Sequence, residues 1–276
     1  MVMYNVMLID ADLWCYDIAF AAQKKDGEVL SFDWVIDLIE TRLKELQEKL
    51  CPEYKMFLTG KDNFRMDIAK QKEYKGNRKQ PKPYWHKAIR DYLVMHHDAT
   101  IVDGMEADDA ITIEMTKNPQ AICVSRDKDL RQCPGWHYAY SVGKQKVFGP
   151  HKYDEMGEVE IIKKELKGGG LKFFYGQVLC GDSTDNYGGC YKVGPVRAKE
   201  ILDPCDDEVE ILFEVLVEFY EAYGPDGLDN FLEQAQLAWM VRSTYEDGAP
   251  VMYQHENNRM HTINQVWYQI VGDVND

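Results

Sequence analysis

The sequence lacks the patterns that mark a disulfide framework, a zinc site or a membrane span. Its 7 cysteines are an odd number, and no two of them are spaced as C-x-x-C. Isolated cysteines of this kind indicate buried single thiols in a reducing compartment. No apolar run approaches the roughly 20 residues of a membrane-spanning helix, and the N-terminal MVMYNVMLID has neither a basic start nor a signal-type cleavage site. We therefore expect a soluble intracellular protein with no membrane partner.

Positive charge is scarce overall but concentrated in one segment. The 276 residues carry 32 lysines and arginines against 47 aspartates and glutamates, for a formal net charge of −15. That balance by itself argues against a nucleic-acid partner. Between Lys61 and Arg90, however, ten basic residues stand against three acidic ones, with aromatic residues interleaved. Such a segment is either a solvated helix face or a surface that binds phosphates and stacks on bases.

The order of the predicted elements indicates an α/β fold with a mostly parallel central sheet, followed by a helical region. The predicted strands are 6–10, 54–60, 99–103 and 120–125. The predicted helices are 12–22, 33–49, 83–95, a helix that GMEADD opens at 104, then 171–182, 195–202, 207–223 and 228–243. Strands that alternate with helices favour a parallel sheet covered on both faces. We place an α/β domain at 1–167 and a helical region at 168–276, whose tail strings VMYQH and QVWYQIV are strand-like.

Carboxylates stand where three of these segments meet one edge of the sheet. Asp10 ends the first predicted strand, and Asp127 follows the fourth, with Asp129 two residues on. Between them GMEADD (104–109) opens a helix. Taken singly, each acid can be an N-cap, a first-turn residue or plain surface. Together they predict a site for Mg²⁺ or Mn²⁺, because clustered carboxylates repel one another unless cations hold them and oxygen-only ligands suit these ions.

The stretch 181–202 combines an acidic pair with a turn suited to phosphate. Asp182 and Asp185 are three residues apart, which would make them neighbours on one helix face. Glycines follow, and then Pro195 stands as the expected first residue of a helix. A loop that opens into a helix presents free N–H groups to a nucleic-acid phosphate. A structural helix-turn-helix is the alternative.

The chain resembles the structure-specific 5′ nuclease superfamily through short motifs that occur in the family's order. The matching strings are LID (8–10), FR (64–65), EYKGNR (73–78), MEADDA (105–110), VSRDKDL (124–130) and GDSTDN…VGPVRAKEIL (181–202). The superfamily includes flap endonucleases, the 5′-nuclease domains of bacterial DNA polymerases and, most similar here, the short 5′→3′ exonucleases of bacteriophages. The resemblance implies a metal-dependent nuclease domain over 1–167 and a DNA-binding region over 168–276 that contains a helix-three-turn-helix motif.

The resemblance also assigns roles to individual residues. The implied metal ligands are Asp10, Glu106, Asp108, Asp109, Asp127, Asp129, Asp182 and Asp185, for two Mg²⁺ or Mn²⁺ ions. The implied catalytic cations are Lys75, Arg78 and Arg65. The implied DNA-binding residues are Tyr74, Lys72, Lys79, Gly188, Gly189, Lys192, Gly194, Arg197 and Lys199. In such relatives the turn that corresponds to 188–194 can hold a K⁺ ion through main-chain carbonyls.

One implied ligand has no counterpart in this sequence. The family usually has an aspartate at the end of the second strand, where FLTGKDNFR places Thr59 or Gly60. Asp62 stands nearby as a candidate substitute. Among the GMEADD acids, we expect Asp108 rather than Asp109 to reach the ion.

The implied activity is hydrolysis of duplex DNA from 5′ ends or nicks. The resemblance makes the chain a two-metal-ion 5′→3′ exodeoxyribonuclease of phage DNA replication or recombination, located in the cytoplasm of a bacterial host. RNA in RNA–DNA hybrids is a further implied substrate. A flap endonuclease that cleaves branched DNA is one alternative, and a catalytically weakened DNA-binding protein is another.

Overall fold

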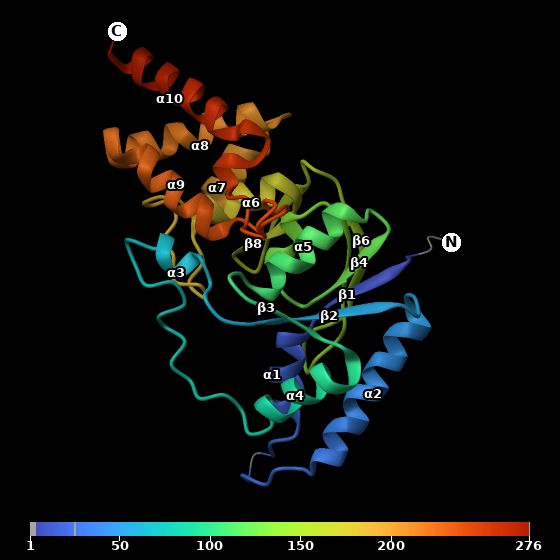
Figure 1. The fold of residues 1–276 in the computed structure, drawn as a ribbon. Helices are drawn as coiled ribbons and strands as arrows, with labels where there is room; N and C mark the ends of the chain where they lie inside the picture. Colours follow the sequence, from blue (N-terminus) through green and yellow to red (C-terminus); the bar gives the residue numbers. More distant parts are fainter. Residues whose placement is uncertain (1–3, 25, 276) are drawn as a thin grey trace. The chain divides into compact units, whose positions relative to one another are not determined.

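The computed structural model describes residues 4–24 and 26–275. The chain forms two compact units whose segments interleave along the sequence (Figure 1). The sheet unit comprises 1–63, 80–130 and 135–152, and the helical unit comprises 64–79, 131–134 and 153–276. The position expected to divide the chain, before residue 168, falls inside the helical unit.

The sheet unit is built on six strands in the order β3-β2-β1-β4-β5-β6. They are β1 (Val6–Asp10), β2 (Tyr54–Thr59), β3 (Thr100–Val102), β4 (Ala121–Val124), β5 (Gly135–Ala139) and β6 (Phe148–Tyr153). β1 lies parallel to both β2 and β4, so that Leu8 faces Lys55 on one side and Cys123 on the other. The β2–β3 and β4–β5 pairs are parallel as well. The expected mostly parallel sheet is confirmed, and its strand order reverses between β1 and β4, where open α/β sheets bind ligands.

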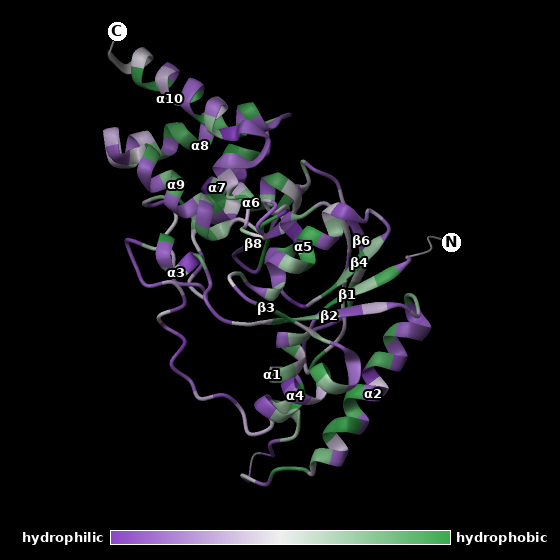
Figure 2. Ribbon diagram, in the orientation of Figure 1, coloured by the Kyte–Doolittle hydropathy of each residue, from purple (hydrophilic) through white to green (hydrophobic). Residues whose placement is uncertain are grey.

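Helices cover both faces of this sheet. They are α1 (Ala11–Ala21), α2 (Phe32–Lys49), α4 (His86–His97) and α5 (Ala107–Lys117). Figure 1 shows α1, α2 and α4 on one face and α5 on the other. Because both faces are covered, every residue of β1 from Met7 to Asp10 is buried, and the strand reads as an unbroken apolar run ending in one acid (Figure 2).

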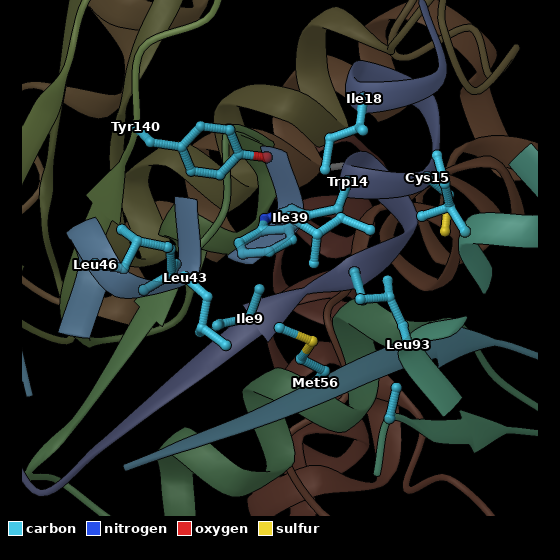
Figure 3. Close-up of a cluster of buried hydrophobic side chains, with 14 of the residues drawn as sticks. Ile9, Trp14, Cys15, Ile18, Ile39, Leu43, Leu46, Met56, Leu93 and Tyr140 are labelled. Carbon is cyan, nitrogen blue, oxygen red and sulfur yellow. The ribbon is translucent and has the colours of Figure 1, made fainter. Parts of the chain in front are cut away.

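The main core lies between the sheet and the α1, α2 and α4 side. Figure 3 shows Trp14 and Ile18 of α1 beside Ile39 of α2 and Ile9 of β1. The buried positions of α2 recur at Val35, Ile39, Leu43 and Leu46, which is the spacing of one helix face. This packing fixes the start of α1, and with it Asp10, at the carboxyl end of β1.

Over its described residues, the helical unit contains five longer helices, a short helix and a hairpin. They are α3 (Arg65–Ile68), β7 (Glu158–Ile162), β8 (Glu165–Gly169), α6 (Gly170–Cys180), α7 (Pro195–Leu202), α8 (Glu208–Tyr223), α9 (Gly227–Ala238) and α10 (Arg259–Asn275). α6 is the central helix, since almost all of it is buried, including Phe173, Phe174 and Tyr175. Within the described residues, no helix combines the length and the apolarity needed to cross a membrane.

The tail, expected to be strand-like, is helical. Tyr253–Asn258 forms a 3₁₀ turn and α10 follows it. Ile263, Val266, Trp267 and Ile270 are buried, at a spacing of three and four residues that belongs to a helix. The ring of Trp267 contacts Tyr220 of α8 with centroids 5.6 Å apart. The β-branched and aromatic residues that suggested a strand instead form an apolar stripe that packs on α8.

Candidate functional site

Asp10 is a buried carboxylate at the point where β1 becomes α1. Its Oδ1 accepts the main-chain N–H of Leu13 at 3.3 Å, which caps the helix, and its Oδ2 accepts the hydroxyl of Ser125 at 2.8 Å. Burial raises the pKa of Asp10 to about 7, and the charges of Asp12 and then Asp127 add to the increase. The structure therefore brings Asp10 and Asp127 together at the reversal of the strand order.

Asp127 lies in a turn that Ser125 organises just beyond β4. The Ser125 hydroxyl oxygen accepts the N–H of Asp127 at 2.9 Å while the same hydroxyl donates to Asp10. Asp127 Oδ1 in turn accepts the N–H of Asp129 at 2.9 Å, and Asp129 is itself buried, with Lys128 Nζ 3.9 Å from its Oδ1. Ser125 thus ties the ends of β1 and β4 together. The sequence contained it inside VSRDKDL, but its role depends on a strand pairing that the string does not reveal.

The acids of GMEADD have different surroundings. Asp109 is fully buried, and its Oδ2 accepts the main-chain N–H of Glu106 at 3.1 Å at the start of α5. Glu106 is also buried, whereas Asp108 is partly exposed. Asp109 therefore caps its own helix, which agrees with the helix-start interpretation, and leaves Asp108 as the more accessible of the pair.

Asp12 is a member of this group that sequence reasoning did not select. Its Oδ2 accepts the main-chain N–H of Thr59 at 2.9 Å, and its Oδ1 lies 3.3 Å from Arg90 Nη1. Burial is the main cause that raises the pKa of Asp12, and the charge of Glu106 contributes. The available signal was the D-x-D spacing in LIDAD, which places two acids on either side of the first residue of α1.

The oxygen donors of the sheet unit fit a hard divalent cation. Burial raises the pKa values of Asp10 and Asp12, and like charge adds to both: Asp12 and Asp127 act on Asp10, and Glu106 acts on Asp12. A cation would remove this penalty, and carboxylate oxygens without imidazole or thiol suit Mg²⁺ or Mn²⁺. In the arrangement described for residues 4–24 and 26–275, no three such side chains already converge on a single point.

In the helical unit, three predicted residues converge on Asp185. Its Oδ2 accepts the hydroxyl of Tyr74 at 3.0 Å, and its Oδ1 lies 2.5 Å from Arg78 Nη2 and 3.9 Å from Lys75 Nζ. The main-chain N–H of Lys75 also donates to the carbonyl of Asp185 at 2.9 Å. The basic string EYKGNR is therefore bound to the acidic string GDSTDN, as a functional pairing of the two requires.

Asp182 and Asp185 stand in a turn and not on a helix, so the helical prediction for this pair is wrong. α6 ends at Cys180, and Asp182 and Tyr187 exchange two main-chain hydrogen bonds of 3.1 Å that close the turn. Asp182 Oδ1 accepts the N–H of Thr184 at 2.6 Å. Short polar side chains favour such turns because they bond to nearby main-chain N–H groups, and this competes with continuation of the helix.

Arg65, expected to face a phosphate, is fully buried. Its Nε donates to the carbonyl of Leu237 at 3.2 Å and its Nη2 donates to the carbonyl of Trp239 at 2.5 Å. These carbonyls lie at the C-terminal end of α9, which ends at Ala238. In this structure the guanidinium holds a helix end, and it is Arg78 that stands exposed beside Asp185.

The glycine-rich turn before α7 is partly buried and carries one exposed lysine, Lys192. Gly189 has left-handed backbone, and a Cβ there would lie 2.3 Å from the nitrogen of Gly181, so only glycine fits. Lys192, also left-handed, is exposed beside Tyr191. Gly194 precedes Pro195 at the first position of α7, and no side chain caps the N–H groups there.

The other predicted DNA-binding cations have varied partners. Arg197 pairs with Glu218, and Lys199 pairs with Asp203. Lys72 and Lys79 are exposed in the helical unit. A Cβ at Gly188 would lie 3.7 Å from Lys72 Nζ, so this ammonium group lies close to the glycine turn.

Comparison with solved structures identifies the architecture, whereas no family model and no curated protein matches the chain. T5 5′-exonuclease with bound divalent zinc ions matches 98% of this chain and 97% of its own, with a TM-score of 0.56 and 13% identity. This chain has the 5′-nuclease fold. A bacteriophage T5 flap endonuclease in a pseudo-enzyme–product complex with DNA and metal ions matches 98% and 97% of the two chains, with a TM-score of 0.55 and 12% identity.

The 5′-nuclease fold is also shared with a more distant protein. The catalytic core of Rad2 in complex with DNA substrate has a TM-score of 0.51 and 10% identity, over 98% of this chain and 89% of that one. The fold implied by the short motifs is therefore confirmed at identities at which sequence comparison alone gives no match.

Proposed function

We propose that this chain is a metal-dependent 5′→3′ exodeoxyribonuclease that acts on duplex DNA from a 5′ end or a nick. The observation that carries the proposal is the pairing of Asp10 with Asp127 at the reversal of the strand order, through the shared contact to Ser125. That position is where an open α/β sheet binds its ligand. The fold is that of T5 5′-exonuclease, and solved structures with this fold contain DNA and metal ions.

The proposed metal ligands in the sheet unit are Asp10, Glu106, Asp108, Asp127 and Asp129, with Asp109 holding the helix start. When bound, two Mg²⁺ or Mn²⁺ ions stabilise the attacking and leaving oxygens of a phosphodiester displacement. The protein's part is to hold the carboxylates in place. Ser125 fixes Asp10 and Asp127 relative to each other, and the positive end of α1 faces the Asp10 carboxylate.

The proposed roles in the helical unit follow from the contacts of Asp185. Asp182 and Asp185 are candidate ligands of an outer ion, and Lys75 and Arg78 supply positive charge to a phosphate. Because Asp185 already orients both cations, they are positioned before the substrate arrives. Tyr74, expected to stack on a base, is buried, and its hydroxyl donates to the same carboxylate, so its proposed role is to position Asp185.

The proposed duplex-binding surface is the turn at 188–194 with the start of α7. Its uncapped N–H groups and the exposed Lys192 suit a DNA phosphate, and its main-chain carbonyls are the candidate ligands of a K⁺ ion. Arg197 and Lys199 extend the basic surface along α7. Lys72 and Lys79 extend it in the basic segment of the helical unit.

A 5′-labelled blunt duplex tests the proposal. With Mg²⁺ the protein should release short labelled products, EDTA should stop the reaction, and Asp127→Ala should lower kcat by about 10²-fold or more through the loss of electrostatic stabilisation. Asp37→Ala, a charge-matched change on the exposed face of α2, should leave the rate unchanged. Full Mg²⁺-dependent cleavage by Asp127→Ala would overturn the proposal, and duplex binding without cleavage at any metal concentration would favour a DNA-binding protein.

A flap endonuclease is the second candidate, because one of the matching structures is described as a flap endonuclease. Between the end of α3 at Ile68 and the start of α4 at His86 the chain forms only turns and coil. The part of the chain between Arg65 and Pro81 is short, and we infer that it forms a small arch beside the proposed active site. Comparison of kcat/KM for a blunt duplex, a nicked duplex, a 5′ flap and an RNA–DNA hybrid separates the two activities and tests the hybrid as a substrate.

A further inference from the structure

We propose that Asp12 supplies to the divalent-ion site the carboxylate that the second strand of this chain does not carry. The inference rests on the proposed function and identifies one more ligand of the same site. The second strand, β2, ends in Thr59 followed by Gly60, and neither residue has a carboxylate. Asp12 belongs to the neighbouring helix α1, and its carboxylate lies at the end of β2.

Hydrogen bonds place the Asp12 carboxylate directly at the end of β2. Its Oδ2 accepts the main-chain N–H of Thr59 at 2.9 Å. The hydroxyl oxygen of Thr59 accepts the N–H of Ala107 at 2.9 Å, which holds the start of α5 against the same strand end. The carboxylate of Asp12 is therefore held where the end of β2 and the first turn of α5, the helix that begins with the GMEADD acids, meet.

Asp12 also interacts electrostatically with two of the proposed ligands, Asp10 and Glu106. The charge of Asp12 acts on Asp10, and the charge of Glu106 acts on Asp12. Asp12 stands in the first turn of α1, where the positive end of the helix dipole stabilises a carboxylate. A cation held by Asp10 and Glu106 therefore has Asp12 as a neighbour that is already fixed in orientation.

Neither the position of Gly60 nor the side chain of Asp62 can supply the missing carboxylate. At Gly60 a Cβ would lie 2.0 Å from Asp103 Oδ1 and 2.6 Å from the carbonyl oxygen of Val102, so no side chain can occupy that position without displacing the main chain. Asp62 is exposed, has left-handed backbone and lies beyond the strand end. No hydrogen bond within the described residues draws its carboxylate toward Asp10.

Arg90 provides the competing explanation for Asp12. Its Nη1 lies 3.3 Å from Asp12 Oδ1, and its Nη2 donates to the carbonyl of Thr59 at 2.6 Å. On that evidence alone, Asp12 and Arg90 could serve only to clamp α1, β2 and α4 together. A clamp changes stability equally with and without metal, whereas a ligand changes the affinity for metal, and this difference can be measured.

A calorimetric titration of the DNA-free protein with Mn²⁺ alone separates the two explanations. Asp12→Asn keeps an oxygen that accepts the Thr59 N–H but loses the charge, and we expect it to weaken Mn²⁺ binding by at least about 10-fold, because loss of even those groups that only support a ligand costs about 10–100-fold. Asp37→Asn, the charge-matched control on α2, should bind Mn²⁺ like the wild type. An unchanged affinity in Asp12→Asn, with a lowered melting temperature in EDTA, would overturn the proposal in favour of the clamp.

A compensating substitution tests the location. Thr59→Asp introduced into the Asp12→Asn background returns a carboxylate to the end of β2, and its oxygen can still accept the N–H of Ala107. We expect this double variant to recover at least about tenfold of the lost affinity, and no recovery counts against the placement of the ligand at the strand end. Asp10→Asn separates this inference from the proposed function. If Asp10→Asn also leaves Mn²⁺ binding intact, the bound ion lies elsewhere and the proposed site is rejected, whereas loss in Asp10→Asn alone rejects only the role of Asp12.

Discussion

At the scale of one residue, Asp10 is a buried carboxylate whose charge lowers the stability of the metal-free protein. Its carboxylate is almost entirely removed from solvent, and it accepts hydrogen bonds from Leu13 and Ser125. These bonds stabilise the charged form. Burial and the nearby acids outweigh them and raise the pKa of Asp10 from 3.8 to about 7. An uncompensated carboxylate at this depth costs stability, and a bound cation offsets that cost.

The pKa of Asp10 predicts how stability depends on pH in EDTA. The folded-state pKa of about 7 lies above the unfolded value, so the folded protein holds this proton more tightly and the contribution of Asp10 to the free energy of unfolding falls as pH rises from about 4 to 7. Asp10→Asn removes this term. Urea unfolding at several pH values should show the variant gaining stability over the wild type toward pH 7, with little difference below about pH 4. A difference that does not vary with pH would contradict the shifted pKa.

Arg65 was expected to bind a phosphate, whereas the structure gives it a role in stabilising the end of α9. Its side chain is buried and bonds to the carbonyls of Leu237 and Trp239. Arg65→Met keeps much of the apolar stem but leaves these carbonyls unpaired, so we expect the free energy of unfolding to fall by about 2–4 kcal/mol. Arg78→Met, on an exposed arginine beside Asp185, should leave stability nearly unchanged and lower the nuclease rate. Urea titrations and rates for both variants check this, and a stable but inactive Arg65→Met would restore the catalytic role.

At the scale of elements, the hairpin of β7 and β8 has a turn that its sequence does not favour. Ile162 faces Glu165, so Lys163 and Lys164 form a two-residue loop, and both have left-handed backbone. Asparagine and glycine adopt that conformation at much lower cost, and Asn-Gly is the preferred pair for such a turn. Lys163→Asn with Lys164→Gly should therefore raise the free energy of unfolding by about 1 kcal/mol. Thermal or urea unfolding measures it, and the reverse order, Lys163→Gly with Lys164→Asn, serves as a comparison.

The same turn explains why some elements were not predictable from the sequence. A Lys-Lys loop gives no hairpin signal, so β7 and β8 went unassigned, as did β5 and β6. The predicted strands β1 to β4 and the helices α1, α2 and α7, in contrast, have strong apolar periodicity or a clear first residue, and the structure has them within a few positions. The tail failed for a different reason: Val266 and Trp267 favour strands locally, but packing on α8 selects the helix.

The carboxylates of the candidate site could be selected from the sequence, whereas their supporting contacts could not. Asp10 and Asp127 follow from the rule that parallel strands end at one edge. Ser125 and Arg90 do not, because each acts by joining segments that are distant in sequence. Asp12 was overlooked because it stands inside a helix, where an acid in the first turn is ordinary. Its contact with Thr59, which places its carboxylate at the end of β2, depends on the fold and could not be seen in the sequence.

At the scale of the whole molecule, the net charge of −15 requires that the proposed DNA binding depend on local basic surfaces. Lys192 is exposed in the turn before α7, so Lys192→Ala should weaken duplex binding and reduce the slope of log K against log salt by about 1. Lys44→Ala, on the exposed face of α2, should leave the slope unchanged. Fluorescence anisotropy with Ca²⁺ in place of Mg²⁺ measures both without cleavage, and equal slopes for the two variants would remove Lys192 from the DNA surface.

The interleaving of the two units has a consequence for how this protein can be divided or recombined. The chain passes from one unit to the other after residues 63, 79, 130, 134 and 152. A gene cut at any single position therefore separates some segment from the contacts that fold it; a cut before residue 168 would leave EYKGNR on one fragment and GDSTDN on the other. Neither unit is a module that can be exchanged with a homologue by one crossover, so the parts proposed to contact DNA and the part that carries the clustered carboxylates must be inherited together.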